Sequence, residues 1–145
     1  YDAAKAWLCG PSYYAWQLCF SAHGNTNEYN QMVQTMANKI INTYNYRENK
    51  TANVVTVTTM DSYNRCSCSS CVAKENEYGA ISGTMIKFLN DVNAKIEASL
   101  GVGKCIIPTF AYLAYKDAPI KNNVPTIHSN VPIILAPIEA NFTYL

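Results

Sequence analysis

Residues 53–61 read Asn-Val-Val-Thr-Val-Thr-Thr-Met-Asp, and this stretch decides the fold class. β-branched side chains fill most of it, which predicts a β-strand over residues 53–60 that ends at Asp61. An amphipathic helix is expected on each side of this strand. A strand between two such helices is typical of an α/β fold in which helices cover a parallel sheet.

The two flanking helices are predicted from apolar residues that recur at steps of three and four. The first follows Asn25, which has Glu28 three residues later, a pairing that resembles a capping box. Its apolar positions are Tyr29, Met32, Val33, Met36, Ala37, Ile40, Ile41 and Tyr44. The second helix is predicted over residues 82–100, with Ser82 as a candidate N-cap and Gly101 just past its end.

Three further apolar runs, residues 15–20, 105–115 and 131–136, are predicted to be strands. The resulting order is strand, helix, strand, helix, strand, strand, which predicts parallel-strand β/α units. In such sheets, ligands bind outside the carboxyl ends of the strands. The side chains expected there are His23, Asp61, the cysteines of the polar loop 62–81, Tyr112, Tyr115, Asp117 and Glu139.

Composition narrows the range of functions. The length of 145 residues is that of one ordinary domain, yet only 14% of residues are charged and the formal net charge is +1. With Arg47 and Arg65 as its only arginines, the chain argues against nucleic-acid or anionic-membrane partners. Prolines and polar residues interrupt the uncharged stretches, so no transmembrane helix is expected. A surface rich in Asn, Thr and Tyr suits neutral, hydroxyl-rich ligands.

The most specific motif lies in the polar loop, where residues 66–71 read Cys-Ser-Cys-Ser-Ser-Cys. Three interpretations fit it. Cys66, Cys68 and Cys71 are spaced to bind one soft metal ion such as Zn²⁺, with His23 or Cys105 as a fourth ligand. In a secreted protein the same residues fit a local disulfide plus a free thiol. The third interpretation is a redox pair at Cys68 and Cys71.

A strand ending in Asp, followed by a polar stretch and C-x-C-x-x-C, resembles the family catalogued as domain of unknown function 4838. The resemblance covers roughly residues 16–140. It includes Gln17-Leu18-Cys19-Phe20 before the first helix, the serine-started segment Ser82 to Asn93, the aromatic strand Phe110-Ala111-Tyr112, and Asn130-Val131. It implies a domain similar to the (β/α)-barrels of α-glucuronidases and other glycoside hydrolases, with a carbohydrate ligand. It also implies a secreted or cell-envelope protein of a bacterium.

A complete barrel of this kind takes about 250 residues and eight strands. Four strands are predicted here, so we expect residues 1–145 to form a single β/α segment resembling half of a TIM barrel. The chain begins at Tyr1 without an initiator Met, and we expect it to be a fragment of a larger barrel domain. Half of a barrel leaves sheet edges exposed, which predicts self-association.

Glycoside hydrolysis requires two carboxyl groups that flank the scissile bond. By position, Asp61 and Glu139 are the predicted catalytic pair, and Tyr112, Tyr115 and Asp117 are the predicted substrate contacts. Asp61 also fits a turn residue, and the two tyrosines also fit core packing. Two alternative functions are a non-catalytic carbohydrate-binding or scaffolding module and a cysteine-rich domain stabilised by structural zinc.

Overall fold

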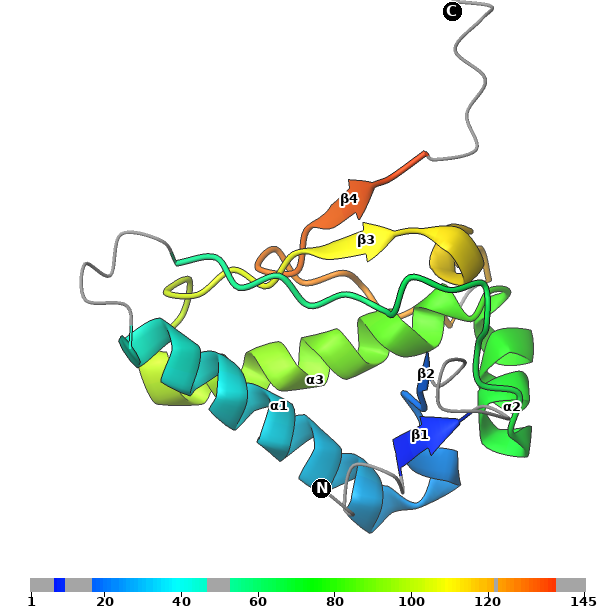
Figure 1. The fold of residues 1–145 in the computed structure, drawn as a ribbon, viewed down its shortest axis with the longest axis horizontal. Helices are drawn as coiled ribbons and strands as arrows, with labels where there is room; N and C mark the ends of the chain where they lie inside the picture. The colour runs from blue at the N-terminus through cyan, green and yellow to red at the C-terminus, as the bar shows by residue number, and fades with distance from the viewer. Residues whose placement is uncertain (1–6, 10–16, 47–52, 122, 138–145) are drawn as a thin grey trace, which may run out of the picture.

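The computed structural model describes residues 7–9, 17–46, 53–121 and 123–137. In this part of the chain, three α-helices and two small sheets form a mixed α/β fold (Figure 1). The helices are α1 (Thr26–Tyr46), α2 (Ser69–Tyr78) and α3 (Ser82–Leu100). The strands are β1 (Leu8–Cys9), β2 (Gln17–Leu18), β3 (Thr109–Ala111) and β4 (Ile133–Leu135), and η3 (Ala22–Gly24) and η4 (Leu113–Tyr115) are short 3-10 helices.

Helices α1 and α3 confirm the helices predicted from apolar periodicity. The side chain of Asn25 accepts hydrogen bonds from the backbone N–H groups of Asn27 (3.0 Å) and Glu28 (3.2 Å), so it caps α1 as predicted. Ser82 does not cap α3, because the N-cap position is Ile81 and the Ser82 hydroxyl instead donates to the Asp117 carbonyl oxygen at 2.5 Å. Gly101 lies just past the end of α3 with a positive φ of 98°.

Helix α2 occupies half of the segment 62–81 that the sequence predicts as a polar loop. The sulfur of Cys68 occupies its N-cap and accepts a hydrogen bond from the backbone N–H of Cys71 at 3.4 Å. Gly79 ends the helix in a left-handed conformation, with a φ of 86°.

Three extended segments run parallel in the order 53–57, 106–111 and 130–136. Strands β3 and β4 pair in parallel, with Phe110 opposite Ile134. Residues 53–57 join the other side of the middle segment through a bridge at Val54–Ile106 and through hydrogen bonds such as Val57 N to Pro108 O (2.9 Å). The parallel order agrees with the prediction for the last three predicted strands.

The first predicted strand differs from expectation. Of residues 15–20, β2 occupies only Gln17–Leu18, and it pairs antiparallel with β1. Its link to the parallel segments is a side chain: Gln17, 1% exposed, accepts from the Met60 N–H and donates to the Met60 carbonyl oxygen, both at 3.2 Å. The side-chain amide of Gln17 thus makes the hydrogen bonds to Met60 that the backbone of a neighbouring strand would make in a regular sheet.

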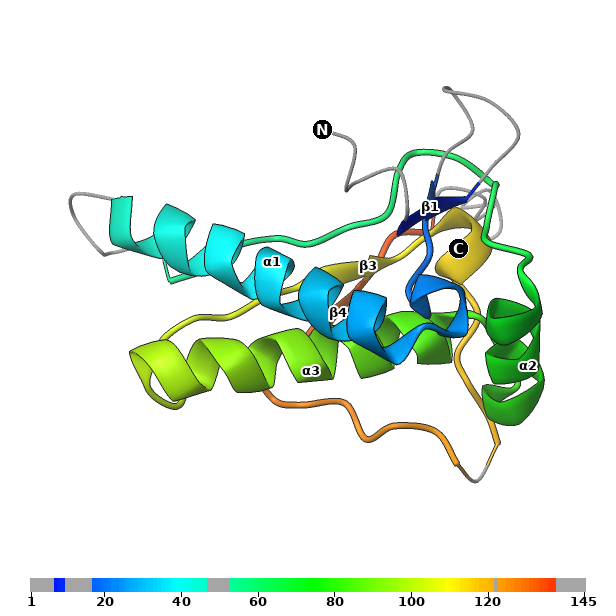
Figure 2. The ribbon, with the colours of Figure 1, turned by 90° about the horizontal axis from the view of Figure 1, so that it is seen from below.

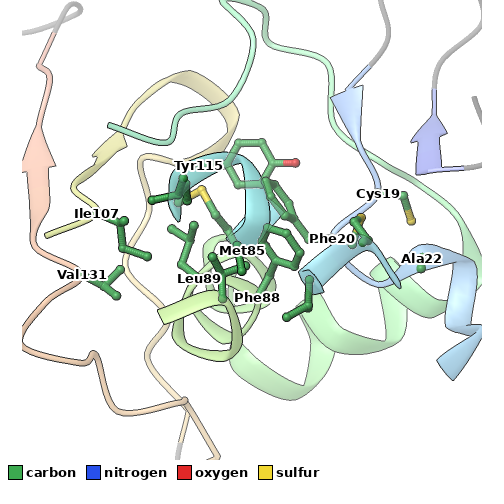
Figure 3. Close-up of a cluster of buried hydrophobic side chains, with 14 of the residues drawn as sticks. Cys19, Phe20, Ala22, Met85, Phe88, Leu89, Ile107, Tyr115 and Val131 are labelled. Carbon is green, nitrogen blue, oxygen red and sulfur yellow. The ribbon is translucent and has the colours of Figure 1, made fainter. Parts of the chain in front are cut away.

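The core lies between the parallel segments and the helices α1 and α3, which pack side by side on one face of them (Figures 1 and 2). Ile107, Val131, Phe88, Leu89 and Tyr115 are among the side chains that fill it (Figure 3). On the opposite face no helix among the described residues covers the strands, and Val54, Met60 and Ile134 are 40–49% exposed. None of the described helices combines the length and the apolarity that a membrane crossing needs.

Candidate functional site

The carboxyl ends of two neighbouring parallel segments bring together an acid and an aromatic ring. Asp61 follows residues 53–60, and Tyr112 follows β3. The Tyr112 hydroxyl donates a hydrogen bond of 2.6 Å to Asp61 Oδ1. This bond to a carboxylate raises the pKa of Tyr112, because the carboxylate stabilises the protonated phenol. The prediction that these two residues lie at one edge of the sheet agrees with this geometry.

The other predicted carbohydrate contacts do not join this pair. Strand β3 gives way to η4 at Leu113, whose φ is 47°, and this turns Tyr115 into the core, where it is 2% exposed. Its ring packs edge-on against Phe20, with centroids 5.7 Å apart (Figure 3). Asp117 is exposed near the start of α3, where its carbonyl oxygen accepts the Ser82 hydroxyl. Glu139 lies outside the described residues.

A second cluster, the thiol cluster, consists of Cys9, Cys19, Cys66, Cys68 and Cys71 together with His23 and Ser21. Its members come from β1, the end of β2, the η3 turn, the loop before α2 and the first turn of α2. Cys19 Sγ lies 3.8 Å from Cys68 Sγ and 3.7 Å from Cys71 Sγ. Since a disulfide bond is about 2.05 Å long, these sulfurs are separate thiols, as the structure records for all five cysteines of the cluster.

Within the thiol cluster, the ligand atoms of Cys19, His23, Cys66 and Cys68 all lie within 4.8 Å of one another, so these residues are able to hold a metal ion. Cys66, Cys68 and His23 are predicted ligands, and the remaining predicted ligand, Cys71, lies beside them against Cys19. Cys105 is buried outside this group, at the amino end of the segment that leads into β3. The residue that sequence reasoning missed is Cys19, which it assigned to a buried strand.

The thiols of the cluster differ in the direction in which their pKa values are shifted. Hydrogen bonds from Cys71 and Cys9 lower the pKa of Cys19, because they stabilise its thiolate. The same interactions with Cys19 raise the pKa values of Cys71 and Cys9. Burial raises the pKa of Cys66 to about 11. A lowered pKa favours the thiolate of Cys19, which is the form of cysteine that binds metal ions.

A cavity of about 270 Å³ lies on the helical side, between the η3 turn and the three helices. Its aromatic walls include Tyr29 and Tyr78, and the ammonium groups of Lys87 and Lys74 lie 5.8 Å and 5.5 Å from the centroids of these rings. Each lysine is also paired with a carboxylate of its own helix. The lysines of this cavity already interact with carboxylates and with the two tyrosine rings. The cavity is therefore a weaker candidate for a binding site than the two sites above.

Together, the fold and these sites define a small α/β domain with an acid–tyrosine pair at its sheet edge and a Cys/His cluster able to hold a metal ion. The chain belongs to the family described as "Domain of unknown function (DUF4838)", whose sequence model matches residues 6–144. The family resemblance seen in the sequence is thereby confirmed. No curated protein and no solved structure is significantly similar to the chain.

Proposed function

We propose that this domain acts on or binds complex carbohydrate at the edge formed by Asp61 and Tyr112. The observation that carries the proposal is the 2.6 Å hydrogen bond between these two side chains at the carboxyl ends of adjacent parallel segments. Aromatic rings stack on the C–H faces of sugars, and a carboxylate accepts hydrogen bonds from sugar hydroxyls. Tyr63, 62% exposed and two residues after Asp61, adds a second ring to this surface.

A glycoside hydrolase-like activity is the sharper form of this proposal. It assigns Asp61 and Glu139 as the two carboxyl groups that hydrolysis needs, in a site that belongs to a larger, TIM-barrel-like domain. The supporting observations are the parallel order of the three extended segments 53–57, 106–111 and 130–136 and the position of Asp61 just past the carboxyl end of the first of them. Tyr115, buried in the core, supports the sheet edge from beneath in this proposal and does not contact the sugar.

Binding measurements test the carbohydrate proposal directly. Neutral and uronic-acid-capped glycans are titrated into the protein by calorimetry, with the variants Asp61→Asn, Tyr112→Ala and Tyr112→Phe. We expect the first two variants to weaken binding about tenfold, equivalent to about 1.4 kcal/mol. Tyr112→Phe keeps the stacking ring and should therefore lose less affinity than Tyr112→Ala. Tyr46→Ala is the matched control, because Tyr46 is 89% exposed at the end of α1.

Two results would contradict the proposal: no binding to any glycan, or equal affinity in all of these variants. Binding without release of sugar would favour the non-catalytic carbohydrate-binding or scaffolding module. If sugar is released, turnover that persists in both Asp61→Asn and Glu139→Gln would remove these carboxylates from the mechanism.

As a second function, we propose that the thiol cluster holds a structural zinc ion that stabilises the domain. The supporting observation is the convergence of Cys19, His23, Cys66 and Cys68 from two stretches of the chain that are far apart in sequence, residues 19–23 and 66–68. Since structural zinc sites contribute directly to folding, a strong chelator should lower the melting temperature of the zinc-loaded protein. Two results would refute this function. One is a protein that contains no zinc after purification in the presence of zinc, and the other is a melting temperature that does not change when the metal is removed.

We also propose self-association through the exposed sheet edges and a secreted or cell-envelope location in a bacterium. The first is supported by the uncovered face of the parallel segments, and the second by the family resemblance alone.

A further inference from the structure

We infer that Cys19, Cys66, Cys68 and His23 are the four ligands of one tetrahedral zinc ion. Cys71 and Cys9 lie beside the metal as thiols that do not bind it. This inference rests on the metal function proposed above and deepens it, because it names the ligands and excludes one thiol of the C-x-C-x-x-C motif. The closed set of four protein ligands makes the site structural.

Spacing is the first argument. Ligand sulfurs at about 2.3 Å from a tetrahedral zinc ion lie about 3.8 Å from one another. Cys19 Sγ and Cys68 Sγ are 3.8 Å apart, and Cys66 and His23 place their ligand atoms within 4.8 Å of both. A small contraction of the group therefore gives a tetrahedral site.

Backbone hydrogen bonds to sulfur are the second argument, and they involve two of the three proposed cysteine ligands, Cys19 and Cys68. The N–H of His23 donates to Cys19 Sγ at 3.1 Å, and the N–H of Cys71 donates to Cys68 Sγ at 3.4 Å. Such bonds neutralise part of the charge that thiolate ligands carry, and they fix the orientation of the sulfurs.

The backbone of the η3 turn is the third argument. Ala22 and His23 both have positive φ values, 44° and 53°, which residues other than glycine rarely adopt. This conformation aims the His23 N–H at Cys19 and brings the His23 ring to the sulfurs. Strain of this kind persists where the surrounding structure enforces it, and it concentrates at functional sites.

Cys71 has other partners. Its sulfur lies 3.1 Å from the Ser21 hydroxyl and 3.7 Å from Cys19 Sγ, while its own backbone N–H serves Cys68. It is therefore a hydrogen-bond neighbour of the ligands. Tyr115 lies close by: its buried hydroxyl has no hydrogen-bond partner among the described residues and points toward the Cys19 side of the core (Figure 3).

The decisive measurement is made on the unaltered protein, so it does not depend on how variants fold. The chain is purified under reducing conditions with zinc, its metal content is measured, and X-ray absorption at the zinc edge counts the ligand atoms. We expect about one zinc per chain, bound by three sulfur atoms and one nitrogen atom. A shell of four sulfurs would overturn the ligand assignment and leave the metal function standing, whereas the absence of zinc would overturn both.

Variants give an independent test through competition with a chromophoric chelator. Cys19→Ser and His23→Ala should each weaken zinc binding by more than the roughly 10- to 100-fold that loss of an outer hydrogen-bond partner costs. Cys71→Ser and Cys105→Ser should each keep one zinc. Zinc retained with full affinity by His23→Ala, or lost only in Cys71→Ser, would exclude His23 as a ligand.

Discussion

The two faces of the parallel segments differ in what covers them. On the face toward α1 and α3, Ile107 and Val131 are 0% exposed, and a close-packed core surrounds them. On the opposite face, Met60 and Ile134 are 49% and 42% exposed, and Asp61 and Tyr112 lie at its end. The comparison teaches that stability resides on the helical face, and that the uncovered face is available for ligands or for further protein.

The largest effect is expected on the helical face. Phe88 is 0% exposed and packs against Phe20 and Tyr29, with ring centroids 5.4 Å and 6.2 Å away. Phe88→Ala should lower the free energy of unfolding by about 3–5 kcal/mol, because it removes buried contacts and leaves a cavity. Met60→Ala, on the uncovered face, should lower it by less than about 1 kcal/mol. Urea denaturation measures both, and equal losses would break the comparison.

Gln17 tests the connection between the terminal hairpin β1–β2 and the parallel segments. Gln17→Ala leaves the backbone N–H and carbonyl of Met60 without their side-chain partners, and it should cost about 1–3 kcal/mol of unfolding free energy. Gln34→Ala is the matched control, since Gln34 is exposed on α1 and its side chain donates to Asn38 on the same helix. A loss at Gln17 no larger than at Gln34 would show that the side-chain bridge does not support the fold.

These elements mark how far the sequence alone predicts the structure. The helices α1 and α3 follow from periodicity that their burial enforces, and the Asp61–Tyr112 pair follows from the rule that parallel strands end at one edge. The apolar run 105–115 predicts a continuous strand and does not predict η4, because the positive φ of Leu113 depends on tertiary packing. Cys19 joins the thiol cluster through contacts with residues about 50 positions away along the chain, which a local pattern does not encode.

A smaller effect is expected from the pH dependence of Tyr29, on the helical face. Burial and the 2.6 Å hydrogen bond to Asp91 raise its pKa above the ordinary value of 10.0. Above pH 10 the unfolded chain loses this proton while the folded chain keeps it, so the unfolding free energy falls as pH rises. Tyr29→Phe removes this proton from both states.

Tyr29→Phe should therefore lower the free energy of unfolding by about 1–2 kcal/mol at neutral pH, because it removes the hydrogen bond to the Asp91 carboxylate. Its unfolding free energy should then fall less steeply above pH 10 than that of the unaltered protein. Tyr46→Phe, at an exposed position on α1, should keep the original slope. Denaturation series at pH 8 to 11 provide the slopes, and an unchanged slope in Tyr29→Phe would contradict this assignment.

The smallest change in stability is expected at β4, on the open edge of the parallel segments. Leu135 is 69% exposed, so Leu135→Lys should alter the unfolding free energy by no more than about 0.5 kcal/mol. A lysine on an edge strand nevertheless opposes pairing with another chain, because that pairing would desolvate its charge. If the protein self-associates through this edge, sedimentation velocity should show that Leu135→Lys shifts it toward the monomer.

The matched control Val102→Lys, at an 81% exposed position after α3, should leave the association unchanged. A shift in both variants would indicate an effect of net charge alone, whereas a shift confined to Leu135→Lys would assign the association to the open edge.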